Sequence, residues 1–335
     1  VFGINMLDWQ DNFTLDYYKA RGIWFFSEAD DITVTPIVEV GIDDVLVEDC
    51  FFFNLGGRGI SVSHKGTPNN PIDEDERNLN YVIRNNTFEQ LGGDGVVFAS
   101  VCNGLVEHND FIDLGWGDHT SQIDRYYGRG EGCWIWDSRN IIVQFNRQLR
   151  ARGFGDTYGS AGHIDFFCKN AIFQFNYSED TEGGFCEILG DCENSTFRYN
   201  VSVNDGFRQH HGFCIWISGY VGQGKPDVRS NNNFIYNNTI VLNNSACTPD
   251  ISIWAENTYI YNNIFKVSNN ASIGDGPLED GVGGVYIDIE LGSEFIVSNN
   301  LFHTSTGGTI DATFTNLDAN KITLDPGFTN EGSVD

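Results

Sequence analysis

Short apolar runs recur along the chain, and each one ends in asparagine. The asparagines that end these runs are Asn86, Asn109, Asn146, Asn176, Asn200, Asn238, Asn263 and Asn300. Successive members lie 23, 37, 30, 24, 38, 25 and 37 residues apart, which is a base period near 24 with insertions of 6 to 14 residues. Self-similarity at such a period predicts a solenoid whose loops grow on one side.

A second short strand follows each of several asparagines after a glycine-rich corner. Such strands are expected at residues 95–98, 132–136, 162–166, 184–188 and 212–216. Short β-branched and aromatic runs with Gly and Asn corners predict an all-β fold, a right-handed parallel β-helix. Asparagine suits the corners because it tolerates left-handed backbone geometry and its amide can bond the asparagine of the next coil. The frame of a leucine-rich repeat is missing, and no segment keeps a helical period for three turns.

No linker rich in proline, serine or charge divides the chain, so we expect one domain over residues 1–335. Within it, residues 1–40 have the least regular pattern. The last coils are expected to end near Asn316, which leaves residues 317–335 as a C-terminal cap or tail.

Alternation along the second strand indicates which side chains face outward. When the strands at 132–137, 162–167 and 184–189 are aligned on their first glycines, the apolar set of each falls on one face. The other face then carries Asp137, His163, Asp165 and Glu187, which we expect to project outward together.

The same alignment puts Asp165 and Glu187 in one slot of consecutive coils, about 4.8 Å apart. Like charges directly opposite one another destabilise a sheet, and such a pair should share one proton near neutral pH. Phe167, Leu189, Phe185 and Ile135 are expected around them on the outer face. Because this arrangement costs stability and shifts pKa values, it indicates a catalytic site. A cation site between coils and a chance alignment in a chain of 47 acidic residues are the alternatives.

Polar and aromatic residues near this pair are candidates for substrate binding. For each of them an ordinary surface or loop-packing role is the alternative. The candidates are His163, Asp137, Arg208, His210, His211, Trp116, Tyr126 and Tyr127.

The charge balance excludes several kinds of partner. Lys and Arg number 19 against 47 Asp and Glu, a formal net charge of −28 at pH 7. Such a chain is poorly suited to nucleic acid or to an anionic membrane surface, and no apolar stretch is long enough to span a bilayer. The chain begins at Val1 without a basic and apolar leader, so we expect a mature form or a segment of a longer protein. The acidic, Asn/Gly/Ser-rich composition favours a secreted, extracellular or periplasmic protein.

The eight cysteines include no CxxC motif, which argues against a zinc site. Cys186 and Cys214 hold inward slots of adjacent coils, and Cys168 and Cys192 each precede an asparagine strand. Each pair lies within disulfide reach, and the alternative is a ladder of buried thiols that behave as small apolar groups. No metal ligand set is expected and no cofactor is required, although Ca²⁺ at the acidic groups stays an alternative.

Paired carboxyl groups with no Ser/His/Asp constellation and no phosphate loop favour cleavage of glycosidic bonds. A spacing of about 5 Å fits the retaining route, in which one carboxylate attacks the sugar and the other carboxyl protonates the leaving oxygen. The substrate would be a plant or algal polysaccharide or oligosaccharide.

The segments at 162–166 and 185–188 resemble the motif pair of the β-helix β-xylosidases. In that family an Asp in a Gly-Ile-Trp-Leu-Asp-Trp-like strand is the nucleophile, and a Glu one coil later is the acid/base. By position the resemblance implies Asp165 as nucleophile and Glu187 as acid/base. Over roughly residues 80 to 300 the chain is similar to secreted bacterial β-helix proteins that act on plant or algal polysaccharides.

Two other functions stay open. Residues 186–190 followed by 207–212 resemble segments of the alginate and chondroitin lyases of this fold, which abstract a proton with lysine. The lysine nearest to Glu187 is Lys169, and a chain of charge −28 repels uronic acids unless Ca²⁺ bridges them. The other alternative is a non-catalytic β-helix that only binds glycans.

Overall fold

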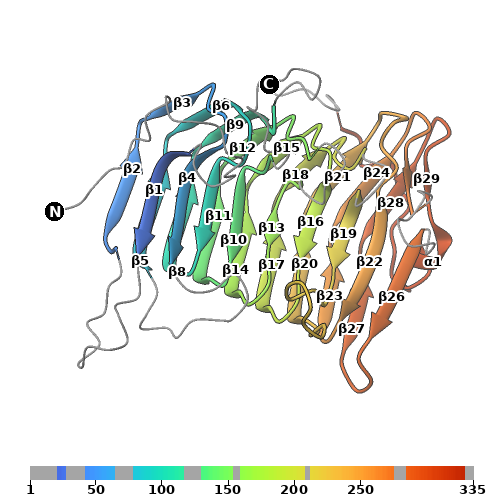
Figure 1. Ribbon diagram of the computed structural model, residues 1–335. Helices are drawn as coiled ribbons and strands as arrows, with labels where there is room; N and C mark the ends of the chain where they lie inside the picture. Colours follow the sequence, from blue (N-terminus) through green and yellow to red (C-terminus); the bar gives the residue numbers. More distant parts are fainter. Residues whose placement is uncertain are drawn as a thin grey trace.

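The computed structural model describes residues 21–27, 42–64, 78–116, 130–153, 159–207, 212–274 and 284–328. Within these residues the chain coils into a right-handed parallel β-helix, and successive turns add one strand to each of three long sheets. The strands follow one another in sequence order from one end of the molecule to the other (Figure 1). The predicted all-β solenoid is therefore confirmed.

In the described part of the chain each long sheet has nine parallel strands. Sheet A consists of β1 (Arg21–Ser27), β4 (Arg58–His64), β7 (Val96–Ala99), β10 (Cys133–Trp136), β13 (His163–Ile164), β16 (Gly184–Ile188), β19 (Phe213–Ile217), β22 (Asp250–Ala255) and β26 (Val285–Ile289). Sheet B consists of β2 (Val45–Glu48), β5 (Asn78–Arg84), β8 (Val101–Glu107), β11 (Arg139–Gln144), β14 (Lys169–Gln174), β17 (Glu193–Arg198), β20 (Asn231–Tyr236), β23 (Thr258–Tyr261) and β27 (Phe295–Ser298). Sheet C consists of β3 (Phe51–Phe53), β6 (Thr87–Leu91), β9 (Asp110–Leu114), β12 (Arg147–Leu149), β15 (Tyr177–Glu179), β18 (Val201–Val203), β21 (Thr239–Leu242), β24 (Ile264–Val267) and β28 (Leu301–Thr304).

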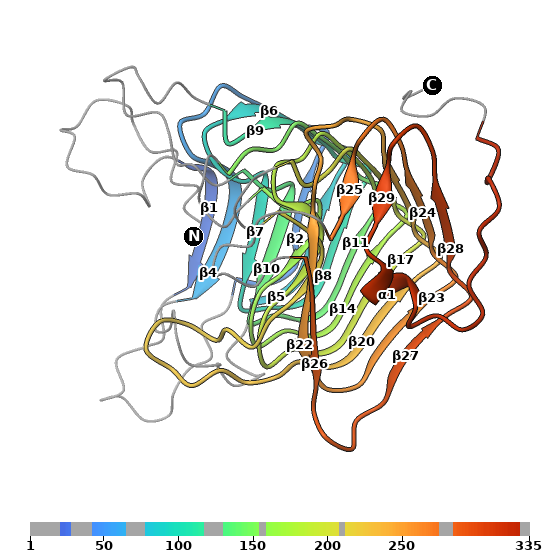
Figure 2. The same ribbon diagram turned by 90° about the vertical axis from the view of Figure 1, so that its right-hand side faces the viewer.

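The last turns close the C-terminal end of the solenoid. A small sheet pairs β25 (Ser272–Ile273) with β29 (Thr309–Ile310), and the short helix α1 (Ala312–Thr315) follows. Figure 2 shows α1 at this end of the coil. Its Phe314 is fully buried and lies edge-on against Phe265 and Phe302, so it shields the last interior rings from water. No helix among the described residues has the length and apolar character to cross a membrane.

A buried ladder of asparagines joins consecutive turns at the corner between sheets B and C. The backbone N–H and the side-chain Nδ2 of Asn176 both donate to Oδ1 of Asn200, at 3.0 and 3.1 Å. The same pair of bonds recurs at each step from Asn86 to Asn300. Asp318 ends the ladder by accepting both bonds from Asn300. The amide-to-amide bonding expected between coils is confirmed.

The expected left-handed geometry belongs to the residue before each ladder asparagine, and at Asn85, Asn237, Asn262 and Asn299 that residue is itself an asparagine. In the buried ladder it is the residue before each asparagine that has positive φ, including Phe145, Phe175 and Tyr199. Asparagines with positive φ form a second ladder at the entry to sheet B, where their side-chain amides bond across the surface. Its members are Asn80, Asn103, Asn140, Asn170, Asn194 and Asn232.

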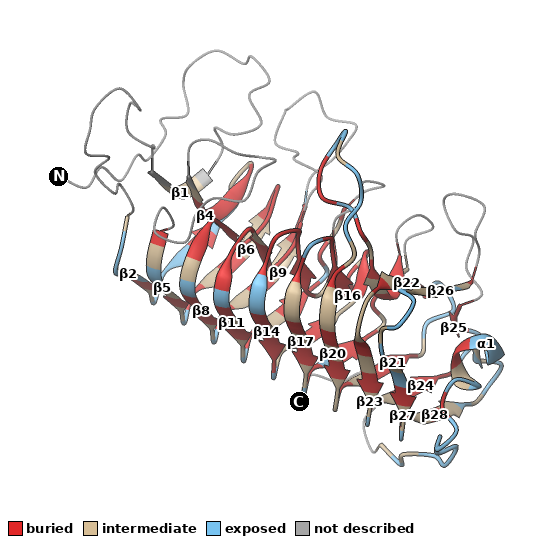
Figure 3. Ribbon diagram, turned by 90° about the horizontal axis from the view of Figure 1, so that it is seen from below, coloured by how far each residue is buried: buried red, intermediate tan, exposed pale blue. Residues whose placement is uncertain are grey.

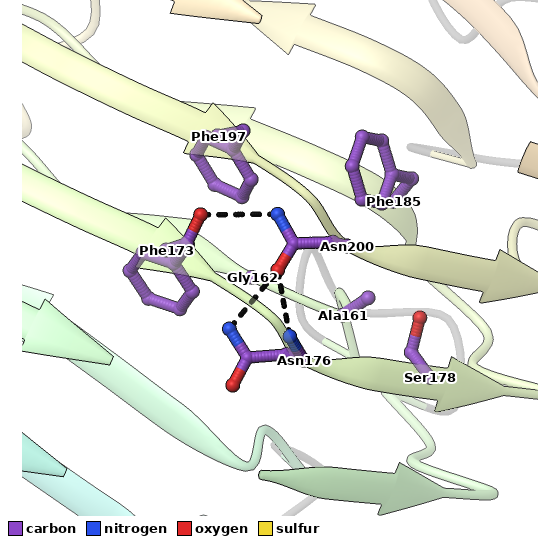
Figure 4. Close-up of a pocket in the computed structure, with 8 residues that line it drawn as sticks. All are labelled: Ala161, Gly162, Phe173, Asn176, Ser178, Phe185, Phe197 and Asn200. Atoms are coloured by element: carbon purple, nitrogen blue, oxygen red, sulfur yellow. Dashed lines mark hydrogen bonds between the residues drawn. The ribbon is translucent and has the colours of Figure 1, made fainter. Parts of the chain in front are cut away.

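The interior is packed with stacked rings and aliphatic side chains. Phe173 and Phe197 stack with centroids 5.0 Å apart, next to the ladder asparagines Asn176 and Asn200 (Figure 4). These four residues line a small interior cavity. Because this cavity lies inside the coil among apolar rings and paired amides, it offers no free polar group to a substrate.

Parts of sheet A differ from sheet B in being covered on both faces. Burial alternates along the sheet B strands β5 and β8, whereas every residue of β7 and of β16 is buried. Figure 3 shows this burial pattern over the coils. The outer face of sheet A is therefore shielded from water at β7 and β16, and polar residues placed there lose solvation.

We predict that Asn200→Ala lowers the free energy of unfolding by about 2–4 kcal/mol, because it leaves donors of Asn176 and the Phe173 carbonyl without their partners. Urea unfolding of both proteins measures the difference. The control is Asn194→Gly in the surface ladder, where glycine accepts the positive φ and the two lost bonds, to Asn170 and from Asn232, are exposed and part-buried. Equal losses in the two variants would contradict a special role for the buried ladder.

Candidate active site

The register of sheet A determines which residues of the candidate site face one another. Trp134 of β10 pairs with His163 of β13, and His163 pairs with Glu187 of β16. Glu187 in turn pairs with Trp216 of β19. One row across four strands therefore reads Trp, His, Glu, Trp.

The alignment on glycines predicted that Asp165 and Glu187 oppose each other on adjacent coils, and this prediction is wrong. His163 is the residue opposite Glu187, and the backbone N–H of Leu189 donates to the carbonyl of Ile164. Asp165 therefore lies level with Leu189, two residues further along the strand direction than Glu187. With strands 4.8 Å apart and a rise of 3.3 Å per residue, the diagonal between the two positions is about 8 Å.

The glycines were unsuitable landmarks because they occupy different positions in the register. Gly184 bridges to Ser160, so Gly162 and Gly184 are offset by two residues. An even offset leaves the facing of a strand unchanged, and His163, Asp165 and Glu187 accordingly share one face. Between β10 and β13 the offset is one residue, because Gly162 lies level with Cys133 rather than with Gly132. An odd offset reverses the facing, so Trp134 and Trp136 face outward instead of inward.

The acids face away from the interior of the coil but are almost fully covered. Ile164 and Ile188, their strand neighbours, belong to the main interior core. On the outer side only 5% of Asp165 and 4% of Glu187 is exposed. Phe167 and Leu189 lie in a separate outer apolar cluster, as expected, whereas Phe185 and Ile135 were placed wrongly and belong to the interior core.

Asp165 is held by two donors. The indole Nε1–H of Trp134 donates to its Oδ2 at 2.9 Å, and the backbone N–H of Phe166 donates to its Oδ1 at 2.8 Å. One carboxylate oxygen of Asp165 is therefore held by the preceding coil and the other by the next residue in the chain.

Glu187 is held by a hydroxyl and an imidazole. The Ser160 hydroxyl donates to its Oε2, and Nε2 of His163 lies 3.3 Å from its Oε1. The other ring nitrogen of His163, Nδ1, lies 2.9 and 3.0 Å from the two carboxylate oxygens of Glu131. The imidazole thus lies between two buried carboxyl groups.

Burial raises the pKa of both candidate catalytic acids. It raises the pKa of Asp165 from 3.8 to about 6, against the opposing effects of the His163 charge and of its two donors. It raises the pKa of Glu187 to about 7, opposed by His163 and reinforced by Glu131. Burial disfavours the charged form of His163, yet the charges of Glu131 and Glu187 outweigh it and raise its pKa to about 10.

A further buried ion pair lies beside Glu131. Nε of Arg58 donates to Oδ2 of Asp94 at 2.8 Å, and Oδ1 of Asp94 accepts from the backbone N–H of Glu131. The Arg58 guanidinium also lies 5.0 Å from the ring centroid of Trp134. These residues form one network that links three turns of the coil.

Sequence reasoning missed Glu131, Asp94 and Arg58. A signal was present, because each of them directly precedes a glycine that enters sheet A. The register of β4, β7 and β10 places these three positions in one row.

Asp137, a predicted substrate contact, lies on the turn before Asp165, and its backbone N–H donates to the Phe166 carbonyl at 3.0 Å. It has a positive φ of 45° at the turn after β10, where it accepts a hydrogen bond from the Ser100 hydroxyl. His163 does join the acids, so this prediction of a neighbour on the same face is confirmed.

The other predicted substrate contacts are only partly described. Trp116 is 51% exposed at the corner after β9, where its backbone N–H donates to the Leu91 carbonyl. Five of the predicted contacts lie outside the described residues, namely Tyr126, Tyr127, Arg208, His210 and His211.

Aromatic residues that were not singled out lie close to the acids. Trp136 and Trp216 pack on the outer apolar cluster of Phe166, Phe167, Leu189 and Val221. Tyr220 lies edge-on to Phe166 and is 46% exposed. The outer face next to Asp165 and Glu187 therefore presents flat apolar surfaces as well as carboxyl groups.

Glu131, His163 and Glu187 are of the residue types that bind metal ions and lie close together. The two carboxyl groups, however, approach opposite nitrogens of the ring. One ligand atom of each residue lies within 4.8 Å of the others. The two carboxyl groups flank the ring as two ion pairs through one imidazole.

The cysteines of the two predicted pairs are buried free thiols. Burial raises the pKa of Cys186, Cys192 and Cys214, which keeps these thiols neutral. Of the two alternatives drawn from the sequence, the thiol ladder is the one that the structure bears out.

We predict that the stability of Asp165→Asn relative to the wild type rises with pH. A carboxyl whose pKa is raised by folding stabilises the folded state fully below its unfolded pKa, and this contribution is lost as pH rises through the folded value. For a pKa raised from 3.8 to about 6, the loss is roughly 3 kcal/mol between pH 3 and pH 8. Urea unfolding across this range measures it.

The matched control is Asp110→Asn, since Asp110 is a surface residue paired with Arg147. It makes the same substitution at an exposed ion pair. A pH profile for Asp165→Asn no steeper than that of Asp110→Asn would show that Asp165 is not desolvated.

Comparison with known proteins gives a distant match. No family model matches the chain. Among curated proteins the chain is similar to lacto-N-biosidase of Bifidobacterium longum subsp. longum, with 31% identity over 178 residues. The matched region is 49% of this chain and 10% of the relative, so the chain spans about a tenth of the length of that protein. About half of the chain is thus distantly similar to part of a glycosidase.

Proposed function

We propose that the protein is a glycoside hydrolase in which Asp165 and Glu187 are the two catalytic carboxyl groups. The observation that carries the proposal is their arrangement as two desolvated, hydrogen-bonded acids on adjacent strands, facing outward beside aromatic surfaces. Burying two acids on one sheet face opposes folding, so the fold itself gains nothing from the arrangement. The distant similarity to a glycosidase supports the same reaction class.

The environments of the two acids suggest different roles. Glu187 has the higher pKa, about 7, and can carry a proton at neutral pH for the leaving oxygen. Asp165 has a pKa of about 6 and accepts two hydrogen bonds, which favour its ionised form. Glu187 is accordingly the acid/base and Asp165 the carboxylate that attacks the sugar.

The proposal of a retaining reaction now rests on the family resemblance alone. The expected separation of about 4.8 Å between Asp165 and Glu187 favoured this route, but their positions in sheet A are about 8 Å apart. Side chains on such a diagonal reach the separations of either stereochemical route. Proton NMR of the first anomer released tests the route directly, and release of the inverted anomer would overturn it.

The proposed substrate is a plant or algal polysaccharide or oligosaccharide, which the protein would cleave outside the cell or in the periplasm. Half-buried Trp216 and exposed Tyr220 support a glycan, because aromatic rings pack against the apolar faces of sugars. The name of the relative adds lacto-N-biosides to the substrates that deserve trial.

We predict that a panel of these substrates gives new reducing ends without unsaturated products, measured by reducing-sugar assay and ultraviolet absorbance. Asp165→Asn and Glu187→Gln should each lower turnover by about 10²–10⁴-fold. The controls are Asp110→Asn and Glu193→Gln, the same substitutions at surface ion pairs. Unsaturated products would show a lyase instead, and unchanged glycan binding with no turnover on any substrate would show a binding protein.

We further predict that activity survives dialysis against EDTA, because the proposed reaction uses only side chains. Turnover before and after chelation is the measurement, with the unfolding transition recorded in parallel. Loss of turnover that added Ca²⁺ restores, without a change in unfolding, would support the alternative of a cation site.

A further inference from the structure

We propose that Glu131 is a positioning residue, which acts through His163 to set the orientation and charge state of the Glu187 carboxyl. The proposal deepens the hydrolase function and rests on it. Glu131 itself lies on the far side of the imidazole from Glu187 and has no exposed surface, so it does not act on a substrate.

The contacts of His163 determine where its protons lie. Both carboxylate oxygens of Glu131 are within 3.0 Å of Nδ1, so Nδ1 carries a hydrogen and donates it. With Nδ1 committed to Glu131, Nε2 is the nitrogen that faces Oε1 of Glu187 at 3.3 Å. A ring held at one nitrogen by a carboxylate keeps its other nitrogen aimed in a fixed direction.

Glu131 is itself rigidly placed by its backbone. Its N–H donates to Oδ1 of Asp94 at 3.2 Å, and its carbonyl accepts from the Gly95 N–H at 2.8 Å. Arg58 compensates the charge of Asp94 on the side away from Glu131. The row of Arg58, Asp94 and Glu131 therefore anchors the imidazole to two earlier turns of the coil.

The charged groups around the ring define its electrostatics. Facing His163 are Glu131 and, behind it, the Asp94–Arg58 pair from the preceding turns, Asp165 on its own strand, and Glu187 on the next strand. The thiols of Cys133 and Cys186 are neutral, because burial raises their pKa well above the ordinary value. The positive imidazolium thus lies among carboxyl groups, and Glu131 is the one that approaches it most closely.

This arrangement serves the proton transfer that hydrolysis requires. Glu187 gives its proton to the leaving oxygen and becomes a carboxylate, which the Nε2–H of His163 then stabilises. Asp165 takes the place of the leaving group on the sugar as the glycosidic bond breaks. Water then displaces Asp165, leaves its hydroxyl on the sugar and gives its other proton to Glu187. Glu131 keeps His163 cationic throughout, so that the ring neither takes nor loses a proton in the cycle.

The test compares two substitutions whose effects have opposite signs. Glu131→Gln removes a negative charge, which lowers the pKa of Glu187 as long as His163 stays cationic, a condition that the His163 titration below checks. His163→Gln removes the positive charge next to Glu187 and raises that pKa. The alkaline limb of the pH profile of kcat/KM should therefore move down in Glu131→Gln and up in His163→Gln, each on the order of one pH unit.

A second measurement does not depend on activity. The ¹⁵N shifts of His163 should show both ring nitrogens protonated at pH 8 in the wild type and a lower pKa in Glu131→Gln, with Glu131→Asp intermediate. The ¹³C titration of the Glu187 carboxyl, assigned by its absence in Glu187→Gln, should shift in the same directions as the limb. Glu193→Gln, which alters a surface ion pair, is the control and should change neither.

The outcomes separate the two proposals. If the NMR titrations shift as expected but no variant or wild type hydrolyses any substrate, the hydrolase function fails while the electrostatic role of Glu131 stands. If wild-type turnover is found and Glu131→Gln leaves both the limb and the His163 titration unchanged, Glu131 has only a structural role and the proposal is wrong. A neutral His163 at pH 8 in the wild type would overturn it as well.

Discussion

The buried asparagine ladder is the constraint on which this coil depends. Each ladder side chain donates to the next turn and accepts from the previous one, and a buried amide that loses its partner costs about 1–3 kcal/mol. A turn that shifted by one residue would break these bonds and also bring its polar residues into the core. The ladder therefore fixes the register of sheets B and C, which adjoin it. On the side of sheet C, sheet A is separated from the ladder by insertions that vary in length from turn to turn. On the side of sheet B, β13 and β16 join β14 and β17 over short corners of four residues each.

Sheet A is where the fold departs from its own regularity. β13 has only two residues, and β16 is buried along its whole length. Outer positions that are open in sheet B hold carboxyl groups, an imidazole and indole rings in sheet A. The cost of desolvating these groups is offset by their mutual hydrogen bonds and by the packing of the interior rings. A candidate site of this kind relies on the ladder, because only a rigid scaffold keeps like charges in place.

Desolvation alone does not distinguish the two acids. Burial raises the pKa of both Asp165 and Glu187, and their difference arises from their neighbours. Asp165 accepts from an indole and from a backbone N–H. Glu187 faces an imidazole whose charge is balanced by Glu131, so the favourable effect of the imidazole on the ionised form is partly cancelled. Proton donor and carboxylate are thereby separated by their surroundings rather than by residue type.

The sequence alone determined the coil, because the asparagine period and the apolar alternation are local patterns that a solenoid repeats. It also identified the outward face of Asp165 and Glu187, since an offset of two residues preserves the facing of a strand. Only the tertiary structure decided which residues oppose each other in sheet A. The three glycines used for alignment are present for different reasons: a Cβ at Gly132 would lie 2.3 Å from the Gln148 side chain, one at Gly162 would lie 2.5 Å from Phe197, and Gly184 has a φ of +108°. A glycine required by packing and one required by backbone geometry look the same in a sequence, so the pairing of His163 with Glu187 and the place of Glu131 behind it depended on contacts between distant turns.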